Sequence, residues 1–120
     1  MLEIGIETSV LIDIRSGRKS IEGRLGKPKF LKVKEGDVLR LREDVWKGGE
    51  IIESLLTDVY IKITQVLYFE SISEMLETLD YKAVLPSALN VEDGIEMYRE
   101  FYSVEDEIEY GVVAMLFELV

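Results

Sequence analysis

The chain has 120 residues, 48% of them hydrophobic, and its 24 Asp and Glu against 14 Lys and Arg give a net charge of −10. A chain of this size builds one core, so we expect a single domain over residues 1–120. With no cysteine and no histidine, the sequence excludes thiol nucleophiles, histidine bases and the usual zinc sites, and we expect no metal and no cofactor.

No segment has the pattern of a membrane span or a signal peptide. The longest uninterrupted apolar run, residues 112–117, is far too short to cross a bilayer. We therefore expect a soluble, cytoplasmic protein with no membrane partner. The single Gln65 and single Asn90, in a chain with 32% charged residues, are typical of proteins from hot environments and predict a thermophilic source.

Charge is distributed very unevenly along the chain. Residues 15–42 hold ten of the 14 basic residues and only three acids, a local balance of +7, so the remainder carries −17. Such asymmetry predicts one face that binds an anion, with phosphate as the first candidate, while the other surfaces repel polyanions.

The first elements follow from hydrophobic alternation and capping. Residues 2–6 alternate apolar and polar, which predicts a half-buried strand, and Thr8 and Ser9 then offer an N-cap for a short helix. Gly17 is the expected C-cap of that helix. A strand over residues 20–25 follows, and it places Ser20, Glu22 and Arg24 together on one face.

The middle of the chain predicts a loop, a hairpin and a long strand. Residues 26–35 indicate an exposed loop whose lysines share one edge if the loop is extended, as a phosphate rail would require. A strand around residues 39–42 has an apolar and a cationic face, and residues 47–49 favour a hairpin turn. Residues 50–56 are either the returning strand or irregular, and residues 59–69 form a long central strand.

The last third predicts helices before a closing strand. Ser71 and Glu74 form a capping box, and apolar residues follow at helical spacing. Asn90 is the expected cap of a second helix, with a further short turn after Ser103. Residues 111–119 predict a strand buried on both faces for much of its length. Strands with inserted helices indicate a mixed α+β domain on a small, partly closed sheet.

The sequence of residues 17–25, GRKSIEGRL, resembles the signature of the ASCH family, the activating-signal-cointegrator homology domains. The similarity extends to most of the chain, in order: residues 34–38, 74–76, 84–86, 98–103 and 110–114. Residues 43–57 lie outside the common pattern, and the sequence assigns them no role.

The resemblance implies a PUA-like small mixed β-barrel with inserted helices, a cleft lined by residues 17–24, and a role in binding RNA. Some ASCH-like proteins are instead amidohydrolases that act on acetylated cytidine, or ribonucleases. The amidohydrolase pattern places a nucleophilic Thr three positions after its Lys. Here that Lys is Lys19 and the later position holds Glu22, whose carboxylate cannot replace the activated alcohol, so binding is favoured over catalysis.

The sequence thus predicts an RNA- or nucleotide-binding domain with a basic cleft. The candidate ligand-binding residues are Arg18, Lys19, Ser20, Glu22, Arg24, Lys27 and Lys29. Arg24 offers a fork of donors to a phosphate or a base edge, and Glu22 offers an acceptor to a base amino group. The simplest structural interpretation of Glu22 and Arg24 is an ion pair across the mouth of a barrel.

Two further hypotheses remain open. The protein is a hydrolase in which Glu22 is the general base and Lys19 stabilises developing negative charge, or it is an interaction module whose acidic helices bind a basic partner. Trp46 and Tyr68 are able to stack on unpaired bases, but core packing or hairpin cover is the favoured interpretation for both, as core or interface packing is for the stripe of Tyr98, Phe101 and Tyr102.

Overall fold

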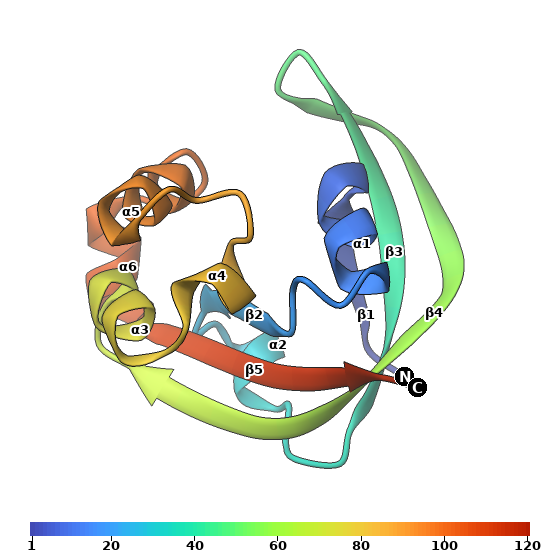
Figure 1. The fold of residues 1–120 in the computed structure, drawn as a ribbon, viewed down its shortest axis with the longest axis horizontal. Helices are drawn as coiled ribbons and strands as arrows, with labels where there is room; N and C mark the ends of the chain where they lie inside the picture. The colour runs from blue at the N-terminus through green and yellow to red at the C-terminus, as the bar shows by residue number, and fades with distance from the viewer.

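The computed structural model describes residues 1–120 and shows an α+β arrangement of one five-stranded mixed sheet and six helices (Figure 1). The elements, in chain order, are β1 (Glu3–Glu7), α1 (Thr8–Arg15), β2 (Ile21–Leu25), α2 (Pro28–Leu31), β3 (Val38–Lys47), β4 (Glu50–Phe69), α3 (Ile72–Thr78), α4 (Tyr81–Val84), α5 (Val91–Arg99), α6 (Val104–Tyr110) and β5 (Val112–Leu119). None of the helices is long and apolar enough to cross a membrane.

The strands lie in the order β1-β3-β4-β5-β2, and only the pair of β1 with β3 is parallel. The strand predicted over residues 59–69 is central, as expected. It begins earlier, at Glu50, so residues 50–56 are the returning strand of a hairpin that turns at Gly48 and Gly49, both with positive φ. Strands β1 and β2 are the two edges of the sheet and do not pair with each other, so the sheet is open.

Two hydrophobic clusters lie on the two sides of β5. Val113, Met115 and Phe117 belong to the cluster that also contains the buried side chains of α1, β1 and β3. Val112 and Ala114 belong to the cluster under α3, α4 and α5. Because alternate residues of one strand point to opposite faces, β5 is buried on both faces over much of its length, which confirms the prediction for this segment.

The predicted helix caps after β4 are confirmed. The side chains of Ser71, Asn90 and Ser103 accept hydrogen bonds from the backbone N–H groups at the starts of α3, α5 and α6, at 3.0, 2.8 and 3.1 Å. Each side chain satisfies a donor that has no partner inside its helix.

Two local predictions were wrong, and one helix was missed. The Thr8 hydroxyl does not cap α1 and instead donates to the Glu43 carboxylate at 2.6 Å. Residues 26–35 are not an extended loop, because Pro28 begins the short helix α2 and Phe30 and Val33 are buried. Hydrophobic burial therefore folds this segment and removes the single edge of lysines that an extended loop would have presented. The short helix α4 has no counterpart among the predicted elements.

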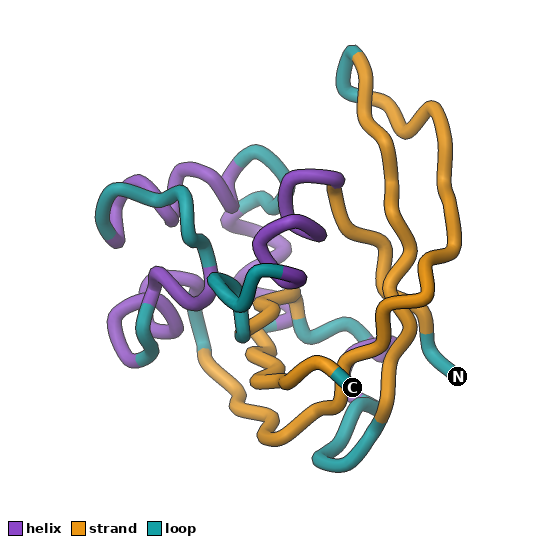
Figure 2. Tube along the Cα trace, turned by 45° about the vertical axis from the view of Figure 1, so that its right-hand side comes forward, coloured by secondary structure: helices purple, strands orange, loops and turns teal.

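The hairpin between β3 and β4 projects beyond the rest of the molecule (Figures 1 and 2). All residues from Glu50 to Leu56 are exposed. The lower part of the same strands is covered, since Leu39, Leu41, Ile61 and Ile63 are all at most 2% exposed. One end of each strand thus belongs to the core and the other end to the solvent.

Candidate functional site

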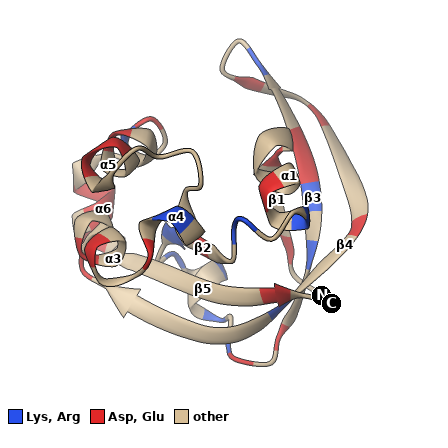
Figure 3. Cartoon of the chain, viewed as in Figure 1, with Lys and Arg blue, Asp and Glu red and all other residues tan.

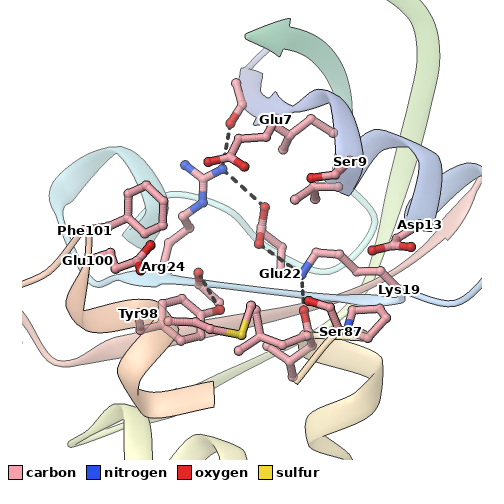
Figure 4. A pocket seen from close by; sticks show the side chains of 18 of the residues that line it. Glu7, Ser9, Asp13, Lys19, Glu22, Arg24, Ser87, Tyr98, Glu100 and Phe101 are labelled. Carbon is pink, nitrogen blue, oxygen red and sulfur yellow. Dashed lines mark hydrogen bonds and ion pairs between the residues drawn. The ribbon is translucent and has the colours of Figure 1, made fainter. Parts of the chain in front are cut away.

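A cavity of about 560 Å³ lies between the β1–α1 region, β2, β3, the segment after α4 and the end of α5 (Figure 4). Its volume falls within the range of small-molecule binding pockets. The side chains of Lys19, Glu22 and Arg24 form a charged cluster that lines it, and we call them the triad. All three come from the segment that the sequence marked as the candidate cleft.

Lys19 is buried, and its ammonium group is fully occupied. Its Nζ donates to the backbone carbonyl oxygens of Ile21, at 2.7 Å, and of Val84, and it lies 3.3 Å from Glu22 Oε1. Burial lowers the pKa of Lys19, and the opposing attraction of Glu22 does not cancel this effect. Because its three N–H groups have three acceptors, Lys19 positions Glu22 and has no donor left for a ligand.

Glu22 lies between two cations. Its Oε1 faces Lys19, and its Oε2 accepts from Arg24 Nη2 at 3.2 Å. Burial by itself raises the pKa of a carboxyl group, but Lys19 and Arg24 together outweigh it and hold the pKa of Glu22 below its ordinary value. Glu22 is therefore an ionised acceptor at neutral pH.

Arg24 joins the two open edges of the sheet. Its Nη2 donates to the backbone oxygen of Gly5 on β1 at 2.8 Å, while Arg24 itself lies on β2. Its guanidinium also lies 5.3 Å from the ring centre of Phe30. Its Nε and Nη1 make no hydrogen bond within the protein, and its side chain is 21% exposed. Arg24 thus retains donors for a ligand in the cavity.

A glycine on β1 leaves room for a second charged pair beside the triad. A Cβ atom at Gly5 would collide with side-chain atoms of Asp44 and Arg42. Those two residues form a second ion pair, in which Arg42 Nε donates to Asp44 Oδ1 at 2.8 Å and the Ser54 hydroxyl donates to the same oxygen, also at 2.8 Å. The hydrogen bond from Arg42, followed by the one from Ser54, lowers the pKa of Asp44 although burial opposes this. Asp44 is buried and also lines the cavity.

Aromatic side chains from two distant segments line the cavity. The rings of Trp46, on β3, and Phe101, after α5, meet edge to face with centres 6.4 Å apart and planes at 71°. They are 42% and 57% exposed, so neither is a core residue, whereas hairpin cover for Trp46 and interface packing for Phe101 stay predictions. Both keep ring surface available for a ligand.

The other two aromatic residues of the predicted stripe are packed more deeply. Tyr98 is buried and donates from its hydroxyl to the Gly23 carbonyl at 3.3 Å, and its ring stacks on that of Tyr102. Burial, followed by the nearby negative charge of Glu22, raises the pKa of Tyr98 well above its ordinary value. Tyr98 is thus a neutral hydrogen-bond donor that fixes the backbone of β2, which confirms core packing for this residue.

The cavity lining as a whole is acidic. Arg24 and Lys19 are its only basic residues, whereas five carboxylate residues line it: Glu7, Asp13, Glu22, Asp44 and Glu100. Further acids lie along α5 and α6 (Figure 3). The basic cleft predicted from the sequence is therefore not what the chain forms, because most of its basic residues lie elsewhere.

Of the seven candidate residues, only the triad lines this cavity. Arg18 is exposed and pairs with Asp13 at 2.8 Å. Ser20 is exposed, and its backbone N–H and carbonyl bond to Ala83 and Phe117. Both residues fix the segment that connects α1 to β2, and neither lines the cavity.

The predicted lysines Lys27 and Lys29 lie outside the cavity. The Lys27 ammonium lies 5.4 Å from the ring centre of Tyr110, and Lys29 lines a second cavity of about 510 Å³ together with Lys32. The basic residues of this stretch thus lie on different surfaces: Lys19 and Arg24 at the first cavity, and Lys29 and Lys32 at the second.

Sequence reasoning missed several cavity residues. Asp44, Trp46 and Phe101 are remote from the signature segment, and nothing in their local pattern joins them to it. Gly5 carried a usable signal, because a glycine inside an alternating strand often marks a close approach of another group. No group of three or more acidic residues is arranged to hold a metal ion.

Comparison with solved structures reveals two similar proteins. The crystal structure of a hypothetical protein, PH0355, is 33% identical in sequence, with a TM-score of 0.83 over 99% of this chain and 98% of that chain. The solution NMR structure of protein PF0455 from Pyrococcus furiosus is 34% identical, with a TM-score of 0.75 over 99% of this chain and 96% of that chain. No family model matches the chain, and no curated protein matches it.

Proposed function

We propose that this chain, which belongs to the same family as PH0355 and PF0455, is a small RNA- or nucleotide-binding domain that takes one unstacked base into its cavity. The observation that carries the proposal is the position of the triad. A buried carboxylate and a partly exposed guanidinium line the same cavity as two exposed aromatic rings. Polar groups that fix orientation beside aromatic surface are the usual means of holding a single base.

The hydrogen-bonding groups of the triad suit the edge of a base. Arg24 supplies N–H donors from Nε and Nη1, and the ionised Glu22 supplies an acceptor for an exocyclic amino group. Lys19 and Arg24 hold one oxygen each of the carboxylate, and each oxygen retains a lone pair for a ligand. Bases that carry an amino group beside a ring acceptor, such as adenine and cytosine, present the complementary pattern.

The acidic lining determines which part of a nucleotide enters. Three of the five carboxylates that line the cavity are paired with cations, and the other two, Glu7 and Glu100, disfavour a phosphate inside it. A neutral base avoids this repulsion, and its phosphates remain at the mouth. We therefore expect nucleosides and unpaired RNA bases to bind better than free nucleoside triphosphates.

The approach of the two edges of the sheet supports two further proposals: that the fold is a PUA-like barrel, and that the chain belongs to the ASCH family. Strands β1 and β2 lie at opposite ends of the strand order, yet Arg24 on β2 reaches the Gly5 carbonyl on β1 at 2.8 Å. A sheet whose two edges approach this closely is curled, as a partly closed barrel requires. The signature segment at residues 17–25 also lies beside the cavity, where the resemblance implies the cleft.

Trp46 provides a direct test, because it is the single tryptophan of the chain and lines the cavity. Adenosine, cytidine, uridine and short single-stranded RNA are titrated while the Trp46 fluorescence is followed. We expect a saturable change with adenosine and cytidine, and roughly tenfold weaker binding in Arg24→Lys, which loses the planar fork. Arg18→Lys is the matched control outside the cavity and should bind as the parent protein does. The absence of any saturable change with all four ligands contradicts the proposal.

The hydrolase alternative makes different demands on Glu22. A general base works best with a pKa near the operating pH, whereas the pKa of Glu22 is lowered and both of its oxygens are engaged. These features favour an acceptor over a proton-abstracting base. Incubation with acetylated cytidine and with RNA oligomers decides the point. Product that is lost in Glu22→Gln while circular dichroism shows this variant to be folded, and that is retained in Glu96→Gln, would replace the binding proposal by the hydrolase.

A further inference from the structure

The projecting β3–β4 hairpin exposes apolar side chains on both of its faces. The exposed fractions are 46% for Ile51, 60% for Ile52, 46% for Leu55 and 52% for Leu56. Successive residues of a strand point to opposite faces, so neither face of this segment is covered by the rest of the chain. Four large apolar residues exposed within six positions exceed what a free surface strand normally carries.

The backbone of the same segment is unpaired along one edge. Strand β4 pairs with β3 along the hairpin, but β5 pairs with β4 only from Ile61 to Phe69. The edge of residues 50–58 that faces away from β3 therefore has no strand beside it. Natural proteins protect such edges with proline, lysine or a covering element, and residues 50–58 contain neither proline nor lysine.

We propose that residues 50–58 of β4 pair in antiparallel fashion with the same segment of a second copy of this chain. The resulting symmetric dimer has a continuous sheet that runs β3-β4-β4-β3 across the two copies. A two-stranded hairpin is marginal in water, and the second copy supplies the strands that stabilise it. This inference concerns the free edge of β4, whereas the cavity is lined from the neighbouring strand β3 by Asp44 and Trp46.

The sequence of the segment selects the register. A two-fold axis between antiparallel strands requires one residue to face its own copy. With Ser54 on the axis, Ile52 lies opposite Leu56 of the second copy, and this apolar pair occurs twice. Glu53 then lies opposite Leu55 and meets no other carboxylate.

The registers with Glu53 or with Ile52 on the axis are less favourable. With Glu53 on the axis, two carboxylates face each other directly, which is destabilising. With Ile52 on the axis, Leu56 faces Gly48 of the turn and loses Ile52 as its apolar partner. In the Ser54 register, acids meet only at the ends, where Glu50 faces Asp58, and Arg40 lies 3.7 Å from the Asp58 carboxylate.

The charge of the segment argues against nucleic acid as its partner. Residues 50–58 carry Glu50, Glu53 and Asp58 and no basic residue, so the edge repels phosphates. In the Ser54 register Ile52 and Leu56 are apolar partners of each other at two symmetric places, which an edge built for an unrelated peptide does not need.

Light scattering over a range of protein concentrations tests the dimer. The parent protein should move from 13.8 kDa at high dilution to twice that mass as concentration rises. Ile52→Lys should remain at the monomer mass, because a charge replaces an apolar contact at two symmetric places. Ile108→Lys changes an equally apolar residue that is 77% exposed on α6, and it should dimerise as the parent does. Circular dichroism confirms that both variants fold.

Two results would overturn the dimer. The first is a parent protein that stays at the monomer mass at every concentration. The second is a larger species that persists unchanged in Ile52→Lys, since it would use another surface.

Cysteine cross-linking tests the register, because the chain has no cysteine of its own. Oxidation of Ser54→Cys should give a disulfide-linked dimer, since the two Cβ atoms lie within bonding reach across the axis. Ile51→Cys faces Thr57 of the second copy in this register and should cross-link at least about tenfold more slowly, because its own copy lies beyond disulfide geometry. Equal rates for the two variants would overturn the Ser54 register.

Discussion

The basic stretch of residues 15–42 has a first half, which contains Lys19 and Arg24, and a second half, which contains Lys27 and Lys29. The two halves differ in what surrounds their charges. Lys19 and Arg24 lie in and beside the core, where one carboxylate links them and two backbone carbonyls complete the coordination of the ammonium. Lys27 and Lys29 lie in solvent around the short helix α2. The same residue types, a few positions apart, therefore have different physical roles. Buried charges are tied to specific partners and define a site, whereas exposed charges only add to a surface potential.

Glu22→Gln should have the largest effect on stability, because it acts on the buried charges. Loss of the carboxylate charge leaves Lys19 and Arg24 without their common counter-charge, and we expect a loss of about 3–5 kcal/mol in the free energy of unfolding. Urea unfolding measures the change. Glu96→Gln, on the exposed side of α5, is the matched control and should lie within about 0.5 kcal/mol of the parent. A small loss in Glu22→Gln would show that water screens the triad.

Lys19→Met should have the next largest effect. The variant leaves the carbonyls of Ile21 and Val84 without their donor, and we expect a loss of about 2–3 kcal/mol. Lys29→Met makes the same change on the exposed half of the stretch and should alter stability by no more than about 0.5 kcal/mol. Equal losses in the two variants would remove the distinction between the halves.

Gly5→Ala tests the approach of β1 to the triad. The added methyl group overlaps the side chains of Asp44 and Arg42, so these must move, and we expect a loss of about 1–3 kcal/mol together with weaker base binding. Thermal unfolding and the Trp46 titration measure the two effects. Gly17→Ala, in an open turn with φ of +82°, should weaken stability through backbone strain while leaving base affinity unchanged.

Acidification should weaken the triad gradually. The pKa of Glu22 is lower in the folded protein than the ordinary value of 4.5, so its ionised form stabilises the fold above that value. This stability is lost as the pH falls from about 4.5 through the lower folded pKa. The free energy of unfolding, measured between pH 7 and pH 3, should therefore fall more steeply for the parent protein than for Glu22→Gln. Parallel curves would contradict the lowered pKa of Glu22.

The smallest effect is expected from Lys27→Ala combined with Lys29→Ala. Neither residue lines the cavity, so the affinity for adenosine and cytidine should not change. Longer single-stranded RNA should lose some affinity only if its phosphates reach α2, and the salt dependence of binding measures that contribution.

Local signals predicted most of the elements. Ser71, Asn90 and Ser103 cap helices where their patterns indicated, because a cap depends on residues three positions apart. The segment of residues 26–35 was mispredicted because its lysines suggested solvent, whereas Phe30 and Val33 fold it against the core. Tertiary packing decided its structure over local composition.

The sequence predicted only those contacts of the site that join residues close together in the chain. Glu22 and Arg24 share a strand face by alternation, and that pairing followed from spacing alone. The acidic lining did not, because Asp44 and Glu100 reach the cavity from β3 and from the end of α5. Only the register of the sheet and the packing of α5 bring them together, and neither is visible in one sequence.

The anchor of Arg24 on the Gly5 carbonyl also divides the cavity lining by position in the chain. Gly5, Lys19, Glu22 and Arg24 lie within the first 24 positions, whereas Trp46 and Phe101 come from later segments. Under the base-binding proposal, substitutions of Trp46 or Phe101 change the aromatic surface offered to the ligand while the charged residues that hold its edge stay in place.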